Sequence, residues 1–150
     1  MAEFHYKSCT LSVRPDSPSD TQAHLVEEQA GQVAQVRVTQ EAPALRLGVV
    51  GPVWQGGTEE ENIELERCYR RALELARQRD LSSISLDSIS VDSKRFPLDR
   101  AAYIAVRTSI LYLDETPEQP LRSVEYVVPQ VQLAQFESIF DEVTRTMAGV

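Results

Sequence analysis

Apolar side chains recur along this chain at two spacings, which predict strands and helices. Short runs that alternate with polar residues, or that are apolar throughout, favour strands. Such runs cover residues 4–13, 33–39, 44–50, 81–90 and 123–128. Apolar residues recur at helical spacing over 59–79, from Asp99 to Leu111, and over 131–147. A short helix over 21–29, capped by Asp20 or Thr21 and ended by Gly31, completes the prediction.

The order of these elements predicts the fold class. From residue 44 onward the chain alternates strand, helix, strand, helix, strand and helix. Alternation of this kind makes right-handed crossovers and a largely parallel sheet with helices on both faces. We therefore expect an α/β protein, a three-layer α/β/α sandwich with a mixed, largely parallel sheet, formed as a single domain over residues 1–150. From the first 40 residues we expect one or two strands at the edge of that sheet.

The start of the first long helix carries a capping signal. Thr58 is a favourable N-cap, and Glu61 stands three residues later, at the spacing of a capping box. Glu59, Glu60 and Glu61 lie where the positive end of the helix dipole favours acids. We therefore expect this helix to begin directly after Thr58.

The chain is acidic, which limits its partners. Its net charge is −8, from 15 Lys+Arg against 23 Asp+Glu. Sequence-independent nucleic-acid binding and docking on anionic lipid both depend on cations, so we expect neither. No apolar run reaches the roughly 18 residues of a membrane span, and the N-terminus lacks the pattern of a secretory signal. We therefore expect no nucleic acid, no membrane, and an intracellular protein of the cytoplasm or nucleus.

Known catalytic and metal-binding patterns are missing from the sequence. It contains no GxSxG, HExxH, GxGxxG, P-loop or CxxC pattern, so we expect no catalytic residue, no metal and no cofactor. Cys68 falls within an apolar helical pattern, where a small core residue fits. We interpret His5 and His24 as surface residues and Asp87 as a hydrogen-bonded acid near a helix N-terminus.

One loop stands where open α/β sheets bind ligands. Residues 90–97 follow a strand and lead directly into the next helix. Ligands of such sheets bind at the carboxyl ends of strands and at helix N-termini. The loop contains no glycine, so its backbone is less free to wrap a phosphate, although Lys94-Arg95 could bind one small anion.

An ordered set of short motifs resembles part of a known family. The set comprises Gly51-Pro52-Val53-Trp54, Cys68-Tyr69-Arg70, Leu73-Glu74-Leu75-Ala76, Ser83-Ile84-Ser85, Ile89-Ser90, Phe96-Pro97 and Ala101-Ala102. On these residues the chain resembles the C-terminal half of the macro domain, over residues 32–147. The resemblance implies an α/β/α sandwich that binds ADP-ribose and that, in some members, hydrolyses ADP-ribose adducts.

The chain departs from the family in both loops that hold the ligand. The family has an Asn-Ala-Ala-Asn run and then a glycine-rich loop on one side of the pyrophosphate. Here the strand over 4–13 leads almost directly to residues 22–31, so that a strand, that loop and much of a helix have no counterpart. The asparagine and the acidic or glycine positions that active hydrolases use also have no counterpart in this chain. The second family loop resembles Ile-Ser-Thr-Gly-Val-Tyr-Gly-Phe-Pro, and here Asp92 and Arg95 replace its glycines.

The resemblance assigns candidate ligand contacts to this second loop. They are Ser90, Val91, Asp92, Ser93, Lys94, Arg95 and Phe96, together with Asp16, which stands near the place of an adenine-contacting Asp in the family. Asp92 would repel a diphosphate, and Lys94 and Arg95 would offset that charge. Phe96 would pack on a ribose or fill the empty pocket. Read by itself, Asp16 is a turn former.

These observations leave two functions. The first is a degenerate, non-catalytic macro-domain protein that acts as an interaction module with weak or lost ADP-ribose binding. The second is a functional binding module for ADP-ribose or a related nucleotide, and a less favoured third is an ADP-ribosyl hydrolase. The implied partners are ADP-ribose or an ADP-ribosylated protein. Because a missing segment exposes a sheet edge or apolar face, we also expect self-association or a protein partner.

Overall fold

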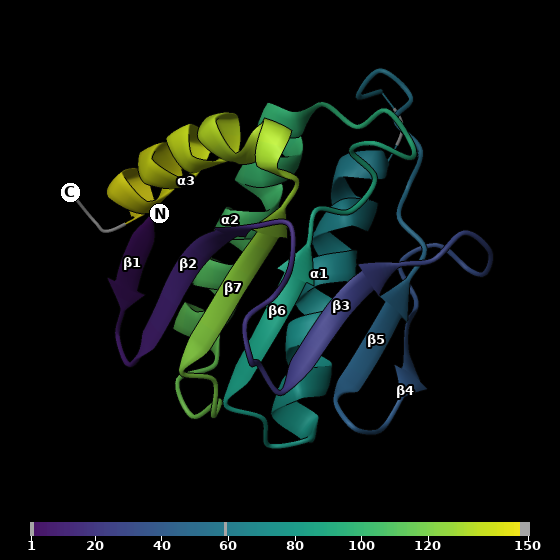
Figure 1. Cartoon of the computed structure of the whole chain (residues 1–150). Helices are drawn as coiled ribbons and strands as arrows, with labels where there is room; N and C mark the ends of the chain where they lie inside the picture. Colours follow the sequence, from purple (N-terminus) through teal and green to yellow (C-terminus); the bar gives the residue numbers. More distant parts are fainter. Residues whose placement is uncertain (1, 59, 148–150) are drawn as a thin grey trace.

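The structure, a computed structural model, describes residues 2–58 and 60–147 (Figure 1). Its elements are β1 (Glu3–Tyr6), β2 (Cys9–Pro15), β3 (Ala23–Glu27), β4 (Val36–Gln40), β5 (Leu45–Val49), α1 (Glu61–Gln78), β6 (Ser83–Asp87), α2 (Leu98–Glu115), β7 (Ser123–Val128), the short 3-10 helix η1 (Gln130–Gln132) and α3 (Leu133–Met147). In the described ranges, no helix combines the length and the apolar character needed to cross a bilayer.

The strands form one seven-stranded mixed sheet in the order β1-β2-β7-β6-β3-β5-β4. Neighbours from β2 to β5 run parallel, whereas β1 and β4 pair antiparallel at the two edges. The expected α/β class with a mixed, largely parallel sheet is confirmed. Because β2, β7, β6, β3 and β5 point the same way, their carboxyl ends meet at one edge of the sheet, the upper edge in Figure 1.

The segment before residue 40 contributes an interior strand that the sequence analysis did not predict. Residues 23–27 form β3 instead of the predicted helix over 21–29, and β3 lies between β6 and β5. Ala23 and Leu25 are buried and alternate with the half-buried His24 and Val26, which is the period of a strand. The expectation that this segment stays at the edge of the sheet is therefore wrong for β3.

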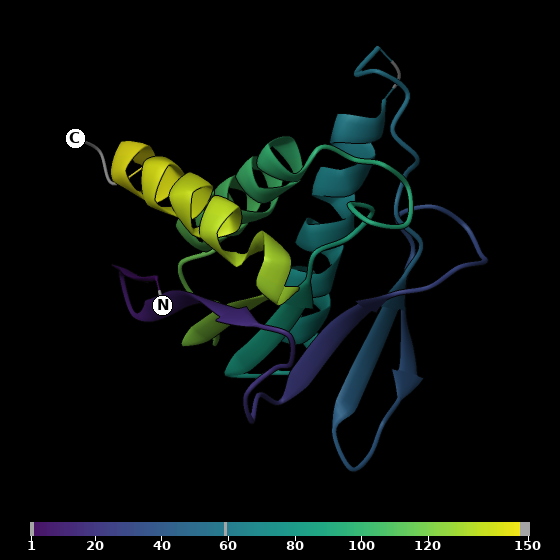
Figure 2. The ribbon, with the colours of Figure 1, turned by 45° about the horizontal axis from the view of Figure 1, so that its top comes forward.

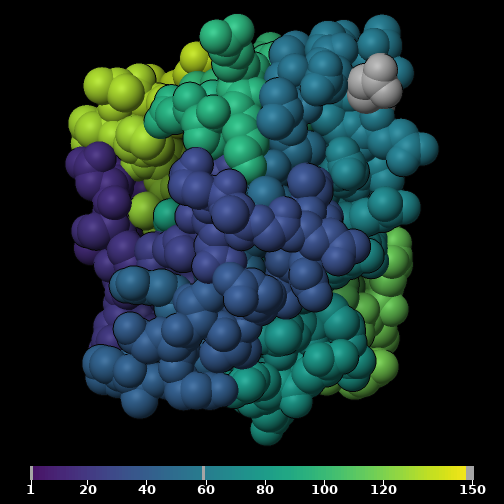
Figure 3. Space-filling view, turned by 90° about the vertical axis from the view of Figure 1, so that its right-hand side faces the viewer, coloured from purple at the N-terminus to yellow at the C-terminus, as the bar shows by residue number. Residues whose placement is uncertain are grey.

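Two other early segments differ from their predicted bounds. Residues 4–13, expected as one strand, form a hairpin of β1 and β2, and Lys7 takes a φ of 56° between them. The strand expected over 33–39 forms as β4, while Val33 makes only an isolated bridge to Val50. Ala34, with a φ of 64°, separates the two. Figure 3 shows the side of the molecule on which this blue segment lies.

Helix α1 begins at Glu61, and the predicted capping box does not form. Glu60 is the N-cap and makes no side-chain capping bond, while the Thr58 hydroxyl donates to the Gln55 carbonyl at 3.2 Å. The buried Glu61 carboxylate instead accepts from the N–H groups of Gln55 at 2.6 Å and Gly57 at 3.0 Å. Glu59 lies outside the described residues. The helix expected over 131–147 divides into η1 and α3.

Helices α1, α2 and α3 lie on one face of the sheet (Figures 1 and 2). Neighbouring strands bury one apolar row beneath them, formed by Val13, Tyr126, Leu86, Leu25 and Leu47. Tyr126 packs on Phe136 and Phe140 of α3, with ring centroids 5.7 and 6.1 Å apart. The described residues place no helix on the opposite face, so they build the sheet and one helical layer of the expected sandwich.

The opposite face of the sheet is polar. At one level across the strands it carries Ser12, Glu125, Ser85, His24 and Arg46. Residues 16–22, here called the crossing segment, join β2 to β3 over this face (Figure 1). Standard strand spacings put the last residue of β2 and the first residue of β3 roughly 19 Å apart. An extended chain of this length covers roughly 28 Å, so the segment can make the connection.

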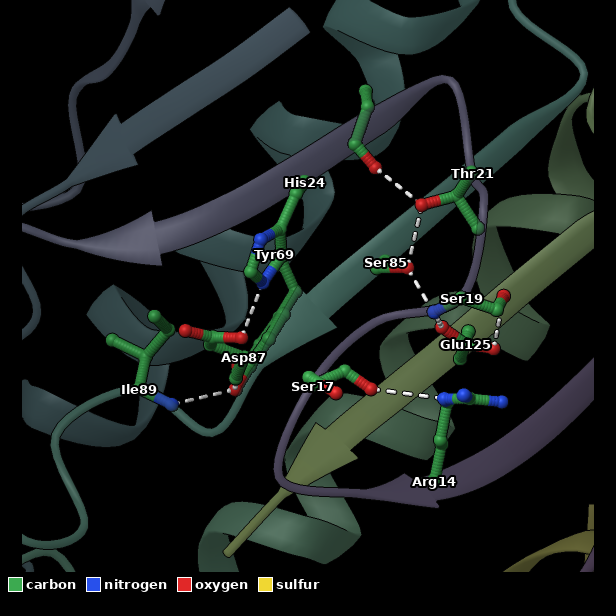
Figure 4. A network of polar contacts seen from close by, with 11 residues as sticks. Arg14, Ser17, Ser19, Thr21, His24, Tyr69, Ser85, Asp87, Ile89 and Glu125 are labelled. Atoms are coloured by element: carbon green, nitrogen blue, oxygen red, sulfur yellow. Dashed lines mark hydrogen bonds and ion pairs between the residues drawn. The ribbon is translucent and has the colours of Figure 1, made fainter. Parts of the chain in front are cut away.

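Glu125 lies beneath the crossing segment and anchors it (Figure 4). Ser19 donates its N–H to one carboxylate oxygen at 2.8 Å and its hydroxyl to the other at 2.7 Å. Ser85 donates to the first oxygen at 2.9 Å, and Thr21 Oγ1 lies 2.7 Å from Ser85 Oγ. A buried carboxylate without such donors is strongly disfavoured. The network therefore holds the crossing segment on the sheet without a helix.

Candidate ligand-binding site

The candidate site is the loop over residues 88–97, at the carboxyl edge of the sheet. Tyr69 of α1 fixes its start, because its hydroxyl donates to the Asp87 carbonyl and accepts from the Ile89 N–H, both at 3.0 Å (Figure 4). Ser90 adopts a φ of 69°, and its carbonyl accepts from the N–H groups of Lys94 and Phe96, each at 3.1 Å. The loop is therefore a tight, internally bonded turn that leads into α2.

The carboxylate of Glu27, at the end of β3, occupies the inner side of this loop. Its Oε1 accepts from the Ser90 N–H at 3.0 Å, and its Oε2 accepts from the Ser93 hydroxyl at 2.8 Å. Lys94 Nζ lies 3.7 Å from Oε2, and 13% of the Lys94 side chain and 15% of the Glu27 side chain are exposed. Backbone amides, hydroxyls and ammonium groups are donors that hold phosphates in other proteins. Here they hold an acid of the same chain.

Trp54, Phe96 and Gly51 close the loop on its other side. Phe96 is only 1% exposed and packs edge-on against Trp54, with ring centroids 5.0 Å apart. The backbone N–H of Trp54 donates to the Lys94 carbonyl at 3.0 Å, and Lys94 Nζ donates to the Gly51 carbonyl at 2.8 Å. A Cβ on Gly51 would lie 2.1 Å from Ser90 Oγ, so glycine allows this close approach. Phe96 thus fills the space beside the loop.

Asp92 and Arg95, which stand where the family loop has glycine, differ in backbone conformation. Arg95 is exposed and has a φ of 64°, in the left-handed region that glycine favours. Asp92 does not occupy that region, and its carboxylate accepts from Gln132 Nε2 at 2.8 Å. Val91 is half-buried and packs on the core. The backbone strain of the altered loop therefore falls on Arg95 and Ser90.

Asp16 lies at the same edge of the sheet and links β2 to η1. It takes a φ of 65°, and its carboxylate accepts from the Gln130 N–H at 2.9 Å, which fits the turn-former interpretation. A pocket of about 210 Å³ brings Asp16, Asp87 and Asp92 together. Clustered carboxylates disfavour a bound diphosphate. Ligand contact by Asp16 and by residues 90–96 remains a prediction.

His24 contacts Asp87 on the polar face of the sheet. Its Nε2 lies 2.5 Å from Asp87 Oδ1, and 20% of the His24 side chain is exposed (Figure 4). The interpretation of Asp87 as a hydrogen-bonded acid is confirmed, whereas His24 is half-buried on a strand instead of exposed on a helix. His5 is largely exposed on β1, as expected, and contacts the Thr10 hydroxyl at 3.0 Å.

The two thiols are unreactive core groups. Burial raises the pKa of Cys68 to about 12 and that of Cys9 to about 11, so both stay protonated at neutral pH. The core interpretation of Cys68, which is fully buried, is confirmed. Within residues 2–58 and 60–147, no cluster of three or more His, Cys, Asp or Glu is arranged to hold a metal ion.

The local sequence pattern did not indicate Glu27 as a site residue, because residues 21–29 were expected to form a helix. As the last residue of β3, Glu27 instead falls at the same edge of the sheet as residues 90–96. The local signal for that strand was the alternation of Ala23 and Leu25 with His24 and Val26. Its contact with Ser90 joins positions 63 apart in the chain, a pairing that no local pattern indicates.

The chain is similar to curated macro-domain proteins over part of its length. A macro domain-containing protein of Methanosarcina mazei is 46% identical over 74 residues, covering 48% of this chain and 40% of that protein. Another from Listeria monocytogenes is 35% identical over 81 residues, covering 54% of this chain and 46% of that protein. The chain therefore spans less than half the length of these relatives.

Solved structures share the fold over most of the chain. An Oceanobacillus iheyensis macrodomain, a glycine-to-valine mutant with ADPR, matches with a TM-score of 0.82 at 23% identity over 99% of both chains. The Trypanosoma brucei macrodomain in complex with ADP-ribose matches with a TM-score of 0.67 at 21% identity, over 81% of this chain and 62% of that chain. The macro domain family model covers residues 16–105, more than half of the sequence. Motifs, fold and family model agree, and the chain belongs to the macro domain family.

Proposed function

We propose that this chain is a non-catalytic macro-domain interaction module whose affinity for ADP-ribose is weak or lost. The observation that carries this proposal is the Glu27 carboxylate inside the loop over 88–97. It already uses the Ser90 N–H and the Ser93 hydroxyl, and it lies beside Lys94. A diphosphate at this place would have to displace one negative charge and lie close to a second, on Asp92.

The carboxylates near the loop also give little support to hydrolysis. That reaction needs a water molecule held against the anomeric carbon by a base. Asp16 accepts from the Gln130 N–H, Asp92 from Gln132, and Glu27 from the loop itself. Each of these carboxylates thus has a structural partner in this conformation, which supports a non-catalytic module.

Calorimetry with ADP-ribose tests the proposal. We expect no saturable heat when free ADP-ribose is raised to millimolar concentration. Saturable binding in the micromolar range that weakens in Ser90→Glu would overturn it and establish the second function.

That second function, a working ADP-ribose module, is supported by one feature of the loop. Ser90 Oγ is buried and has no hydrogen-bond partner in the part of the chain that the structure describes. A ligand that displaced Glu27 would find this hydroxyl and the Ser90 amide close together. The partner would then be ADP-ribose or an ADP-ribosylated protein, as the solved macrodomains with ADPR and ADP-ribose illustrate.

The interaction role implies a protein partner or a second copy, inside the cell. The sheet face that carries no helix in the described residues is polar, so it supports this role less than exposed apolar residues do. Ile63 and Tyr103 are 48% and 49% exposed. Sedimentation velocity measures self-association: a strictly monomeric profile at high concentration would exclude the second copy and leave a different protein as the partner.

A further inference from the structure

The outer surface of α1 and α2 carries a groove that the loop over 88–97 does not use. Helix α2 contributes Arg100, Tyr103, Ile104 and Arg107, whose spacing places them on one side of the helix. Across from them α1 contributes Asn62, Ile63 and Glu66, and together these residues line a volume of about 240 Å³. The two helices run side by side (Figure 2). We call this feature the α1–α2 groove.

The middle of the groove is apolar and open to solvent. Ile63 on one helix and Tyr103 on the other are each about half exposed, although large apolar side chains are mostly buried in this chain. Tyrosine and arginine are enriched among the residues that contribute most to protein–protein binding. The composition therefore fits a protein-binding surface.

Two arginines of α2 give the groove a net positive charge. Arg100 lies over the Trp54 ring at 5.6 Å, and neither Arg100 nor Arg107 has an ion pair within residues 2–58 and 60–147. Glu66 is the acid that lines the groove. A neighbouring hollow of about 320 Å³ shares Arg100 and Tyr103 with the groove and is also lined by Asp99 and Glu142. In a protein of net charge −8, this groove is a local site of opposite sign.

We propose that the α1–α2 groove binds an acidic segment of a partner protein. An apolar side chain of that segment packs between Ile63 and Tyr103, and carboxylates on either side of it pair with Arg100 and Arg107. These arginines lie seven positions apart on α2, about 10 Å along the helix, which is about three residues of extended chain. This inference deepens the proposed interaction function and rests on it.

Peptide display tests the inference. A random nonapeptide library is panned against the full chain, and enriched peptides are labelled with fluorescein for anisotropy. We expect enriched peptides to carry two acids flanking an aromatic or aliphatic residue. Tyr103→Ala and Arg107→Glu should each weaken their binding at least tenfold, and raising the salt concentration should weaken binding to the unmodified protein. Tyr103 is exposed and Arg107 is half-buried without being part of the core, so the fold should persist, which circular dichroism checks.

Arg46→Glu is the matched control, because it makes the same charge change on the opposite face of the sheet. It should leave peptide binding unchanged. No enrichment, enrichment of peptides without acids, or equal loss in Arg46→Glu would overturn the inference. The inference would also be overturned if the unmodified protein formed a dimer and Tyr103→Ala were monomeric, because a second copy would then occupy the groove. Calorimetry with ADP-ribose reports separately on the loop, so failure of the groove and failure of the proposed function are distinguishable.

Discussion

Replacing Glu27 by alanine should open the loop over 88–97 to an anion. The change removes the acceptor of the Ser90 N–H and of the Ser93 hydroxyl, and the charge beside Lys94. Hydrogen bonds to charged groups contribute about 1.5–3 kcal/mol each, so a ligand that need not break these two gains roughly 3–6 kcal/mol. That corresponds to about 100-fold to 20,000-fold in affinity. We expect Glu27→Ala to bind ADP-ribose in the micromolar range.

Two measurements follow this change. Calorimetry gives the dissociation constant, and tryptophan fluorescence gives an independent readout because Trp54 is the only tryptophan in the sequence. The backbone N–H of Trp54 is bonded to the Lys94 carbonyl and its ring packs on Phe96, so a change in the loop should change its emission. Glu28→Ala is the control, since it removes the adjacent carboxylate, which pairs with Arg37 at 2.8 Å outside the loop.

One result would refute this reasoning. If Glu27→Ala is folded by circular dichroism and thermal melting, yet binds ADP-ribose no better than Glu28→Ala, then Glu27 does not block the loop. The absence of the family's glycine-rich loop would then be sufficient to explain weak binding.

Three further predictions concern stability. Arg95→Gly should raise the free energy of unfolding in urea by about 0.5–1 kcal/mol, because glycine accepts a φ of 64° without strain. Ser19→Ala should lower it by about 1–3 kcal/mol, because the buried Glu125 loses a donor. Alkaline pH should destabilise the fold, because burial raises the pKa of Cys68 from 9.0 to about 12 and the unfolded chain ionises first. The Cys68 thiol does not affect stability below pH 9, and its contribution should lower the free energy of unfolding by on the order of 1 kcal/mol per pH unit between pH 9 and 12.

Each of these predictions has a matched control. Arg95→Ala keeps a Cβ at the strained position, so equal stability of the alanine and glycine variants would contradict the strain argument. Ser17→Ala changes a neighbouring hydroxyl of the crossing segment and should be nearly neutral, and a loss as large as that of Ser19→Ala would contradict the role of Glu125. Cys68→Ala should reduce the alkaline slope without removing it, because burial also raises the pKa of Cys9 to about 11. An unchanged slope would assign the pH dependence to other groups.

The sequence predicted the fold best where each element's own period identifies it. Helix α1 repeats its apolar residues over several turns, and β5 and β7 are short, almost continuous apolar runs, so their assignments needed no knowledge of neighbours. Strand β3 is different, because its residues alternate for a single short stretch that a helical pattern also accommodates. Its pairing with β5 and β6 determines that this stretch is a strand and not a helix, and that pairing is a tertiary interaction.

The candidate site shows the same division. The position of the loop over 88–97 followed from its place between a strand and a helix. The contact between Glu27 and that loop could not be predicted in this way, because Glu27 reaches the loop only when β3 lies inside the sheet. Similarly, the capping box at Thr58 and Glu61 obeys a local spacing rule, but the Glu61 carboxylate bonds the amides of Gln55 and Gly57 instead.

The crossing segment has a consequence for how this domain can be extended. Strands β2 and β3 are placed by their neighbours β7, β6 and β5, so their order does not depend on what joins them. The free-energy cost of a flexible connection grows slowly, by about 0.6 kcal/mol for each doubling of its length. A longer insert between Pro15 and Ala23 should therefore leave the strand order of the sheet unchanged. At this junction the fold can accept or lose a helical layer on the polar face of the sheet.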